Sequence, residues 1–155
     1  MMRARFSAVL VLAILLMPAG ALAQPAQKKI ATVAVLAPGP LTPQRQRNFD
    51  VLRDVLRARG WVEGRNIAVE YHHADEKPER IPEIAAVLVR SRPDVIVAFG
   101  GSAIARPLQR ATGTIPIVMI AASDPVREGL VKSLARPGGN ITGTHVEHSA
   151  LAAKR

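Results

Sequence analysis

Two consecutive glycines and a serine, Gly100, Gly101 and Ser102, follow a short apolar run in this sequence. Glycine has no Cβ atom, so the backbone can turn sharply there and approach a bound molecule closely. Residues 103–112 then have helical spacing, so the free N–H groups and the positive dipole end of a helix lie at this junction. The junction predicts a site for an anion such as a carboxylate or a phosphate. The alternative is a tight strand-to-helix turn that Ser102 caps.

Stronger motifs for nucleotide binding or hydrolysis are absent around this junction. No lysine follows the glycines as in a phosphate-binding loop, the three-glycine spacing of a dinucleotide site is missing, and Ser102 does not lie in a G-x-S-x-G turn. Asp124 follows the next apolar run and precedes a proline. Its carboxylate can cap a turn or contact a ligand, and the residues alone leave both interpretations open.

The sequence gives no support for a metal site, a cofactor or a catalytic residue. It contains no cysteine, which excludes disulfides, thiolate ligands and a cysteine nucleophile. His72 and His73 are adjacent at a predicted strand end and would point to opposite faces, while His145 and His148 flank Glu147 near the end of the chain. We expect both pairs to be exposed loop histidines. The predicted protein is a binding protein and not an enzyme.

The chain is basic, with 21 lysines and arginines against 12 acidic residues among 155. Its length and composition are those of one ordinary globular domain. Nucleic-acid binding is not expected, because no aromatic residues lie among the arginines to stack on bases. We expect a solvated basic surface, with attraction to anionic lipids or ligands as the alternative. The arginines in question are Arg45, Arg47, Arg53, Arg57, Arg59 and Arg65.

Residues 1–23 have the pattern of a cleavable signal peptide. Arg3 and Arg5 precede an apolar run that is too short to span a bilayer, and the small residues of Ala21-Leu22-Ala23 form a cleavage site. The alternative is an uncleaved N-terminal anchor. Residues 24–29 are expected to be a flexible lead, and the signal peptide predicts an exported, periplasmic protein.

Strands and helices are predicted to alternate along the rest of the chain, which indicates an α/β fold with a parallel sheet and helices on both faces. Thr42 and Pro43 predict the start of the first helix, and Gly60 its end. Trp61 is expected to pack this helix end against the sheet, with a ligand platform as the alternative. The predicted strands are 30–36, 67–71, 94–99, 115–120 and 141–144, and the predicted helices begin at 43 and 78 and span 103–112 and 125–134.

In a parallel sheet of this kind, ligands bind beyond the carboxyl ends of the strands, at the point where the strand order reverses. The loops that qualify are 37–41, 100–103 and 121–124. The strand at 67–71 contains polar residues and is expected near the edge of the sheet.

Three stretches of the chain resemble a known family: IATVAVLAPG, ARGWVEGRNIAVEYHHADEKPERIPEIAAVLVRSRPDVIVAFGG and TIPIVMIAASDPVREGLVKSLARPGGNITG. They are similar to the periplasmic substrate-binding proteins of ABC transporters, and most of all to the group described as tryptophan- or tyrosine-binding-like. The resemblance covers residues 30–155. The run from Ser123-Asp124-Pro125 to Gly143 is its most specific part.

The resemblance implies a Rossmann-like lobe of a type I periplasmic-binding-protein fold. Residues 30–144 would form the N-terminal lobe, and residues 145–155 the truncated start of the crossover to a second lobe that this sequence lacks. The resemblance also implies a small-molecule ligand such as an amino acid, a membrane permease as partner, and no chemistry. A second hypothesis stays open: a truncated or decayed fragment, or a single-lobe sensor or interaction module without a transport role.

For an amino-acid ligand, the resemblance implies a carboxylate at Gly101, Ser102 and Ala103 and an ammonium group at Asp124. The segment 38–41 would flank the ligand side chain. The full set of expected ligand-binding residues is Pro38, Gly39, Leu41, Gly100, Gly101, Ser102, Ala103, Ser123 and Asp124.

Overall fold

The computed structural model describes residues 30–146. The predicted signal peptide (1–23), the predicted lead (24–29) and residues 147–155 of the predicted crossover lie outside the described residues. The elements are β1 (Ala31–Ala37), α2 (Pro43–Ala58), β2 (Ile67–His73), η1 (Pro78–Arg80), α3 (Ile81–Ser91), β3 (Val95–Phe99), α4 (Ser102–Ala111), β4 (Ile117–Ala122) and β5 (Ile141–His145).

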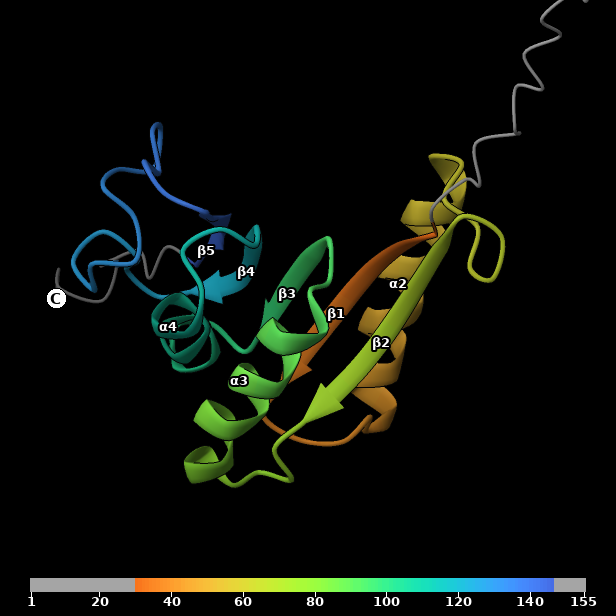
Figure 1. Cartoon of the computed structure of the whole chain (residues 1–155), viewed down its shortest axis with the longest axis horizontal. Coiled ribbons are helices and arrows are strands. Elements are labelled where there is room, and N and C mark those ends of the chain that lie inside the picture. The colour runs from red at the N-terminus through yellow and green to blue at the C-terminus, as the bar shows by residue number, and fades with distance from the viewer. Residues whose placement is uncertain (1–29, 147–155) are drawn as a thin grey trace, which may run out of the picture.

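The five strands form one parallel sheet in the order β2-β1-β3-β4-β5. The predicted α/β fold with a parallel sheet is therefore confirmed, and β2 is an edge strand as expected. The chain runs outward from β1 to β2 and then crosses back to β3 on the other side of β1 (Figure 1). The strand order thus reverses between β1 and β3, at the carboxyl ends where loops 38–42 and 100–101 begin.

Helices cover both faces of the sheet, with α2 on one face and α3 and α4 on the other (Figure 1). Side chains alternate between these faces along each strand. Leu36, Ile96 and Ile117 point into a large core with α3 and α4. Val35 and Val97 point into a smaller core with Phe49 of α2. Burial of these apolar side chains is the main favourable contribution to folding.

Local signals set both ends of α2 as predicted. Thr42 is the N-cap, and its hydroxyl accepts a hydrogen bond from the Arg45 N–H at 3.3 Å. After the helix, Gly60 has a φ of +86° and the Trp61 N–H donates to the Leu56 carbonyl at 2.9 Å. This pattern is the Schellman end, in which a left-handed glycine satisfies the last helical carbonyls.

Only some of the apolar residues of α2 face the sheet. Phe49 is buried and Leu52 and Leu56 are half-buried, but Val55 is 49% exposed. One helix turn separates Val55 from Val51, which is also exposed. Both valines therefore lie on the outer side of α2, because only the row through Phe49 faces the sheet.

The predicted helix over 125–134 is wrong, because this segment forms consecutive turns. The N–H groups of Leu130 and Val131 both donate to the Pro125 carbonyl, at 2.9 and 3.2 Å, so the chain closes on itself and does not advance as a helix. Gly129 has a φ of +69° within this reversal. Leu130 and Val131 are buried in the large core, so the turn segment covers the sheet where a helix was expected.

Pro107 lies inside α4, beyond its first turn. The proline removes the hydrogen bond to the carbonyl of Ala103. Ala103 is exposed, so water can satisfy that carbonyl. Ile104 and Leu108 are buried on the inner side and hold the helix against the sheet. Within residues 30–146, no helix combines the length and apolar character needed to cross a bilayer.

Replacing Gly143 by alanine should destabilise the fold by about 3 kcal/mol. Gly143 has a φ of +148°, and a Cβ atom there would lie 2.7 Å from the carbonyl carbon of Met119 and overlap its oxygen. Urea unfolding followed by far-UV circular dichroism measures the change. Gly113→Ala is the matched control, because nothing lies within 4 Å of its Cβ position. It should change stability by no more than about 0.5 kcal/mol, and equal effects of the two variants would contradict the account.

Candidate ligand-binding site

The loops after β1, β3 and β4 lie together at the carboxyl edge of the sheet. A Cβ atom on Gly100 would lie 3.1 Å from Cδ of Pro38, and one on Gly101 would lie 2.8 Å from the Ala121 carbonyl oxygen. Gly100 and Gly101 also have φ angles of +139° and +65°. Both positions therefore require glycine, for space and for backbone conformation.

Gly101 is the N-cap of α4, and the helix begins at Ser102. Ser102 is therefore not the cap, contrary to one of the sequence-based interpretations. The Gly101 N–H donates to the Ile120 carbonyl at 3.0 Å, so it is not available to a ligand. Within residues 30–146, the N–H groups of Ser102 and Ala103 have no hydrogen-bond partner. These two groups, which we call the amide pair, carry the positive end of the α4 dipole.

The Ser102 hydroxyl is a buried polar group beside the amide pair. Its Oγ atom is shielded from solvent and has no hydrogen-bond partner among the described residues. A buried hydroxyl without a partner is costly, because desolvation is not compensated.

Long-range contacts hold the loop after β1. The Tyr71 hydroxyl donates to the Gly39 carbonyl at 2.9 Å, and Arg45 donates to the Pro40 carbonyl at 3.2 Å. Arg45 also forms an ion pair with Glu76 at 2.6 Å. A Cβ atom on Gly39 would overlap this ion pair, so the loop lies directly against it.

Sequence reasoning missed Arg45, Tyr71 and Glu76 as residues that position the site. The partners are about thirty residues apart in the chain, and no local motif links them. In the loop that they hold, Pro38 is half-buried, Gly39 is buried and Leu41 is exposed.

Ser123 and Asp124 line an open cavity of about 430 Å³ beyond β4 and β5, together with Arg127, Leu134 and His145. The Asp124 carboxylate caps the turn that follows, since Oδ1 accepts from the Arg127 N–H at 3.0 Å and Oδ2 lies 3.4 Å from Arg127 Nε. The capping interpretation of Asp124 is therefore observed. The Arg127 side chain is 84% exposed, so its ion pair with Asp124 is weak.

The histidines differ from the prediction of exposed loop residues. His72 and His73 belong to β2 and are half-buried. Nε2 of His72 lies 3.4 Å from Glu70, and Nδ1 of His73 lies 2.9 Å from Asp75. His145 ends β5 and is exposed, while His148 lies outside the described residues. No group of three or more potential metal ligands occurs in the part of the chain that the structure describes.

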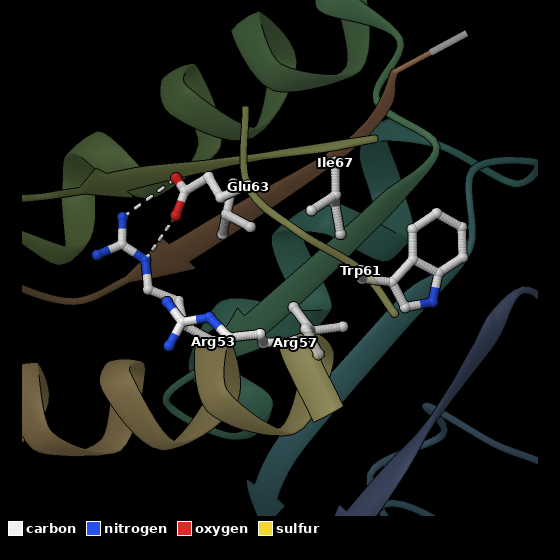
Figure 2. Close-up of a pocket in the computed structure, with 7 residues that line it drawn as sticks. Arg53, Arg57, Trp61, Glu63 and Ile67 are labelled. Carbon is white, nitrogen blue, oxygen red and sulfur yellow. Dashed lines mark hydrogen bonds and ion pairs between the residues drawn. The ribbon is translucent and has the colours of Figure 1, made fainter. Parts of the chain in front are cut away.

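A second, shallow cleft lies away from this edge, between the end of α2 and the start of β2 (Figure 2). Arg53 and Glu63 form a two-contact ion pair at 3.0 and 3.1 Å across it. The Trp61 backbone closes the end of α2 as expected for a packing role, but the residue as a whole is 44% exposed.

The five-stranded parallel sheet with helices on both faces defines a lobe of the Rossmann-like α/β class. Residues 32–154 match the family described as ABC transporter substrate binding protein, and the chain belongs to this family. Members of the family bind their substrate and do not transform it. The predicted family, the absence of enzymatic function and the fold as one lobe of a periplasmic-binding-protein fold are therefore confirmed.

Several known proteins are similar to this chain. It is 39% identical over 89 residues to the Tyrosine-binding protein of Clostridioides difficile, covering 57% of this chain and 26% of that protein. A conserved domain protein from Vibrio cholerae is 40% identical with a TM-score of 0.68, over 74% of this chain and 38% of that one. An ABC domain from Streptococcus pneumonia in complex with L-Trp is 26% identical with a TM-score of 0.67, and the match covers 76% of this chain and 39% of that one.

A ligand-free, open substrate-binding protein with adhesive properties from Clostridium difficile is 28% identical with a TM-score of 0.71. The match covers 78% of this chain and 40% of that one. The chain thus spans between about a quarter and two fifths of the length of these relatives.

Tyr71 should titrate above the ordinary tyrosine value. Burial raises the pKa of its phenol above 10.0, Arg45 opposes this shift and Glu76 adds to it. Tyr71 is the only tyrosine in the chain, so phenolate absorbance reports it alone. We expect a midpoint above 10.0 in the folded protein and a return to the ordinary value in urea.

The same shift makes stability depend on pH. Because the folded-state pKa is the higher one, this contribution to stability is fully present below about pH 10 and is lost as the pH rises from there through the folded-state pKa. Tyr71→Phe should lack both the absorbance transition and this component of the pH dependence. A folded-state midpoint at or below 10.0 would contradict the burial of the phenol.

Proposed function

We propose that this protein is the solute-binding component of an ABC importer and binds a small carboxylate-bearing molecule, such as an amino acid, without chemistry. The observation that supports this most is the amide pair of Ser102 and Ala103, together with the buried Ser102 hydroxyl, which has no partner in the part of the chain that the structure describes. Two N–H donors and one hydroxyl donor thus belong to the first turn of α4, at the positive end of its dipole. A carboxylate supplies the two acceptor oxygens that such donors need.

The ligand carboxylate binds the N–H groups of Ser102 and Ala103 and the hydroxyl of Ser102. The Gly101 N–H already donates to the Ile120 carbonyl and does not bind the ligand. Gly101 instead allows the start of α4 to lie close to the Ala121 carbonyl. Gly100 keeps the space beside Pro38 open. Of the three N–H groups implied by the resemblance, those of Gly101, Ser102 and Ala103, the proposed site thus uses the last two.

The rest of the ligand lies between the loop after β1 and the loop after β4. Pro38, Gly39 and Leu41 flank its side chain on one side, and Ser123 and Asp124 lie on the other. The ammonium group of an amino acid pairs with Asp124 in exchange for the exposed Arg127. This exchange is inexpensive because a surface ion pair contributes only about 0–1 kcal/mol.

Aromatic amino acids are the ligand class that the relatives favour, since one is described as a Tyrosine-binding protein and another is a complex with L-Trp. The protein acts outside the cytoplasmic membrane and delivers its ligand to a membrane permease. A second lobe completes the pocket in the two-lobed relatives and excludes water from the ligand, which raises affinity.

The proposal predicts that L-tyrosine shifts the backbone amide signals of Ser102 and Ala103 in ¹H–¹⁵N NMR spectra. L-tyrosinamide should shift them far less, because it has the same side chain but no carboxylate. Equal shifts with both compounds, or shifts confined to residues 125–134, would contradict carboxylate binding at the amide pair.

Ser102→Ala should weaken this binding about threefold to tenfold, because one hydrogen bond to the ligand is lost. It should not lower the melting temperature of the ligand-free protein, since the hydroxyl has no partner among the described residues. Ser91→Ala is the matched control, because the Ser91 hydroxyl donates to Leu88 at the other end of the sheet. Ser91→Ala should leave the ligand-induced shifts unchanged. Unaltered affinity in Ser102→Ala would count against the proposal.

A further inference from the structure

Arginines gather at the amino edge of the sheet, opposite the candidate site. The helices run antiparallel to the strands, so the carboxyl ends of α2, α3 and α4 all lie at this edge. Each helix ends in exposed arginines or is followed by them. We call this surface the basic edge, and its members are Arg57, Arg59, Arg65, Arg90, Arg92 and Arg110.

Most of this charge is not neutralised. Within residues 30–146, only Arg57 of the six has a carboxylate within ion-pair distance, Asp54 at 3.3 Å. Glu63 lies at this edge but is engaged by Arg53. Asp94 also lies there and accepts the Thr32 N–H at 2.9 Å, which makes it part of the fold. The basic edge therefore presents a net positive field.

Compensation of helix dipoles explains part of this arrangement. Arg57, Arg90 and Arg110 lie in the last turns of their helices, where a cation is favourable. It does not explain Arg92, which is the C-cap of α3 with φ and ψ of 53° and 56°. This left-handed position favours glycine, and a side chain there is strained. Position 92 thus carries an arginine at the basic edge although its backbone conformation favours glycine.

An exposed aromatic side chain accompanies the arginines. Trp61 follows Arg59 at the end of α2, and its half-exposed ring lies beside Ile67 in the shallow cleft (Figure 2). The chain enters β1 nearby, because the Ala31 N–H donates to the Asn66 carbonyl at 3.0 Å. Ile30 is also exposed there, and Lys28 and Lys29 precede it in the sequence.

We propose that the basic edge docks on an anionic phospholipid surface, with Trp61 at the level of the headgroups. Arginine and lysine attract anionic headgroups, and tryptophan partitions to the membrane–water interface. Docking at the basic edge directs the carboxyl edge, with its amide pair, away from the membrane. This proposal does not depend on the identity of the ligand.

Trp61 is the only tryptophan in the chain, so its fluorescence reports this edge directly. The experiment titrates the full chain with vesicles of phosphatidylcholine alone or mixed with phosphatidylglycerol, with and without brominated acyl chains. We expect a blue shift and bromine quenching of Trp61 only with phosphatidylglycerol, and both should decrease as salt is raised.

Arg59→Gln and Arg92→Gly should each weaken vesicle binding about fivefold. Arg92→Gly should not lower the melting temperature, because glycine suits the left-handed position. Arg47→Gln is the matched control: it removes the same charge from the opposite end of α2, where Arg47 contacts Gln44, and it should bind as the unchanged protein does.

Three results would each overturn the proposal. The first is an equal response of Trp61 to neutral vesicles, which would indicate insertion of another apolar segment. The second is an equal loss of binding in Arg47→Gln, which would indicate attraction by net charge alone. The third is the same Trp61 response to duplex DNA at equal phosphate concentration, which would indicate a nucleic-acid surface.

Discussion

The candidate site depends on the close approach of Gly101 to the end of β4. The Gly101 N–H donates to Ile120, and no side chain larger than hydrogen fits between Gly101 and the Ala121 carbonyl. Ala121 itself has a φ of +60°, a conformation that alanine seldom adopts. The contact holds the start of α4 against the sheet, and the N–H groups of Ser102 and Ala103 then have no partner among residues 30–146. Backbone strain of this kind is often concentrated where a protein binds its ligand.

The parallel sheet gives its two edges opposite electrostatic character. Helix amino ends and strand carboxyl ends lie at one edge, where the amide pair offers donors to an anion. Helix carboxyl ends lie at the other edge, where arginines accumulate and Arg92 has a strained conformation. One topology thus separates the candidate ligand-binding edge from the basic edge by the length of the sheet.

Features with local causes could be predicted from the sequence, and features with distant causes could not. The cap at Thr42 and the stop at Gly60 follow from neighbouring residues, and alternation of strands and helices gave the parallel sheet. The turns over 125–134 were missed because Leu130 and Val131 are buried by tertiary packing that overrides helical spacing. The glycine junction was visible, but the contact of Tyr71 with Gly39 joins residues 32 positions apart. The hydrogen bond from the Gly101 N–H to the Ile120 carbonyl, which makes this N–H unavailable to a ligand, likewise forms only when the sheet is in place.

The most direct test of the account is a crystal structure of this chain grown with an aromatic amino acid. The account predicts density for the ligand carboxylate within hydrogen-bond distance of the Ser102 and Ala103 nitrogen atoms and of Ser102 Oγ. A carboxylate bound elsewhere, with water or a protein group on the amide pair, would contradict the central claim.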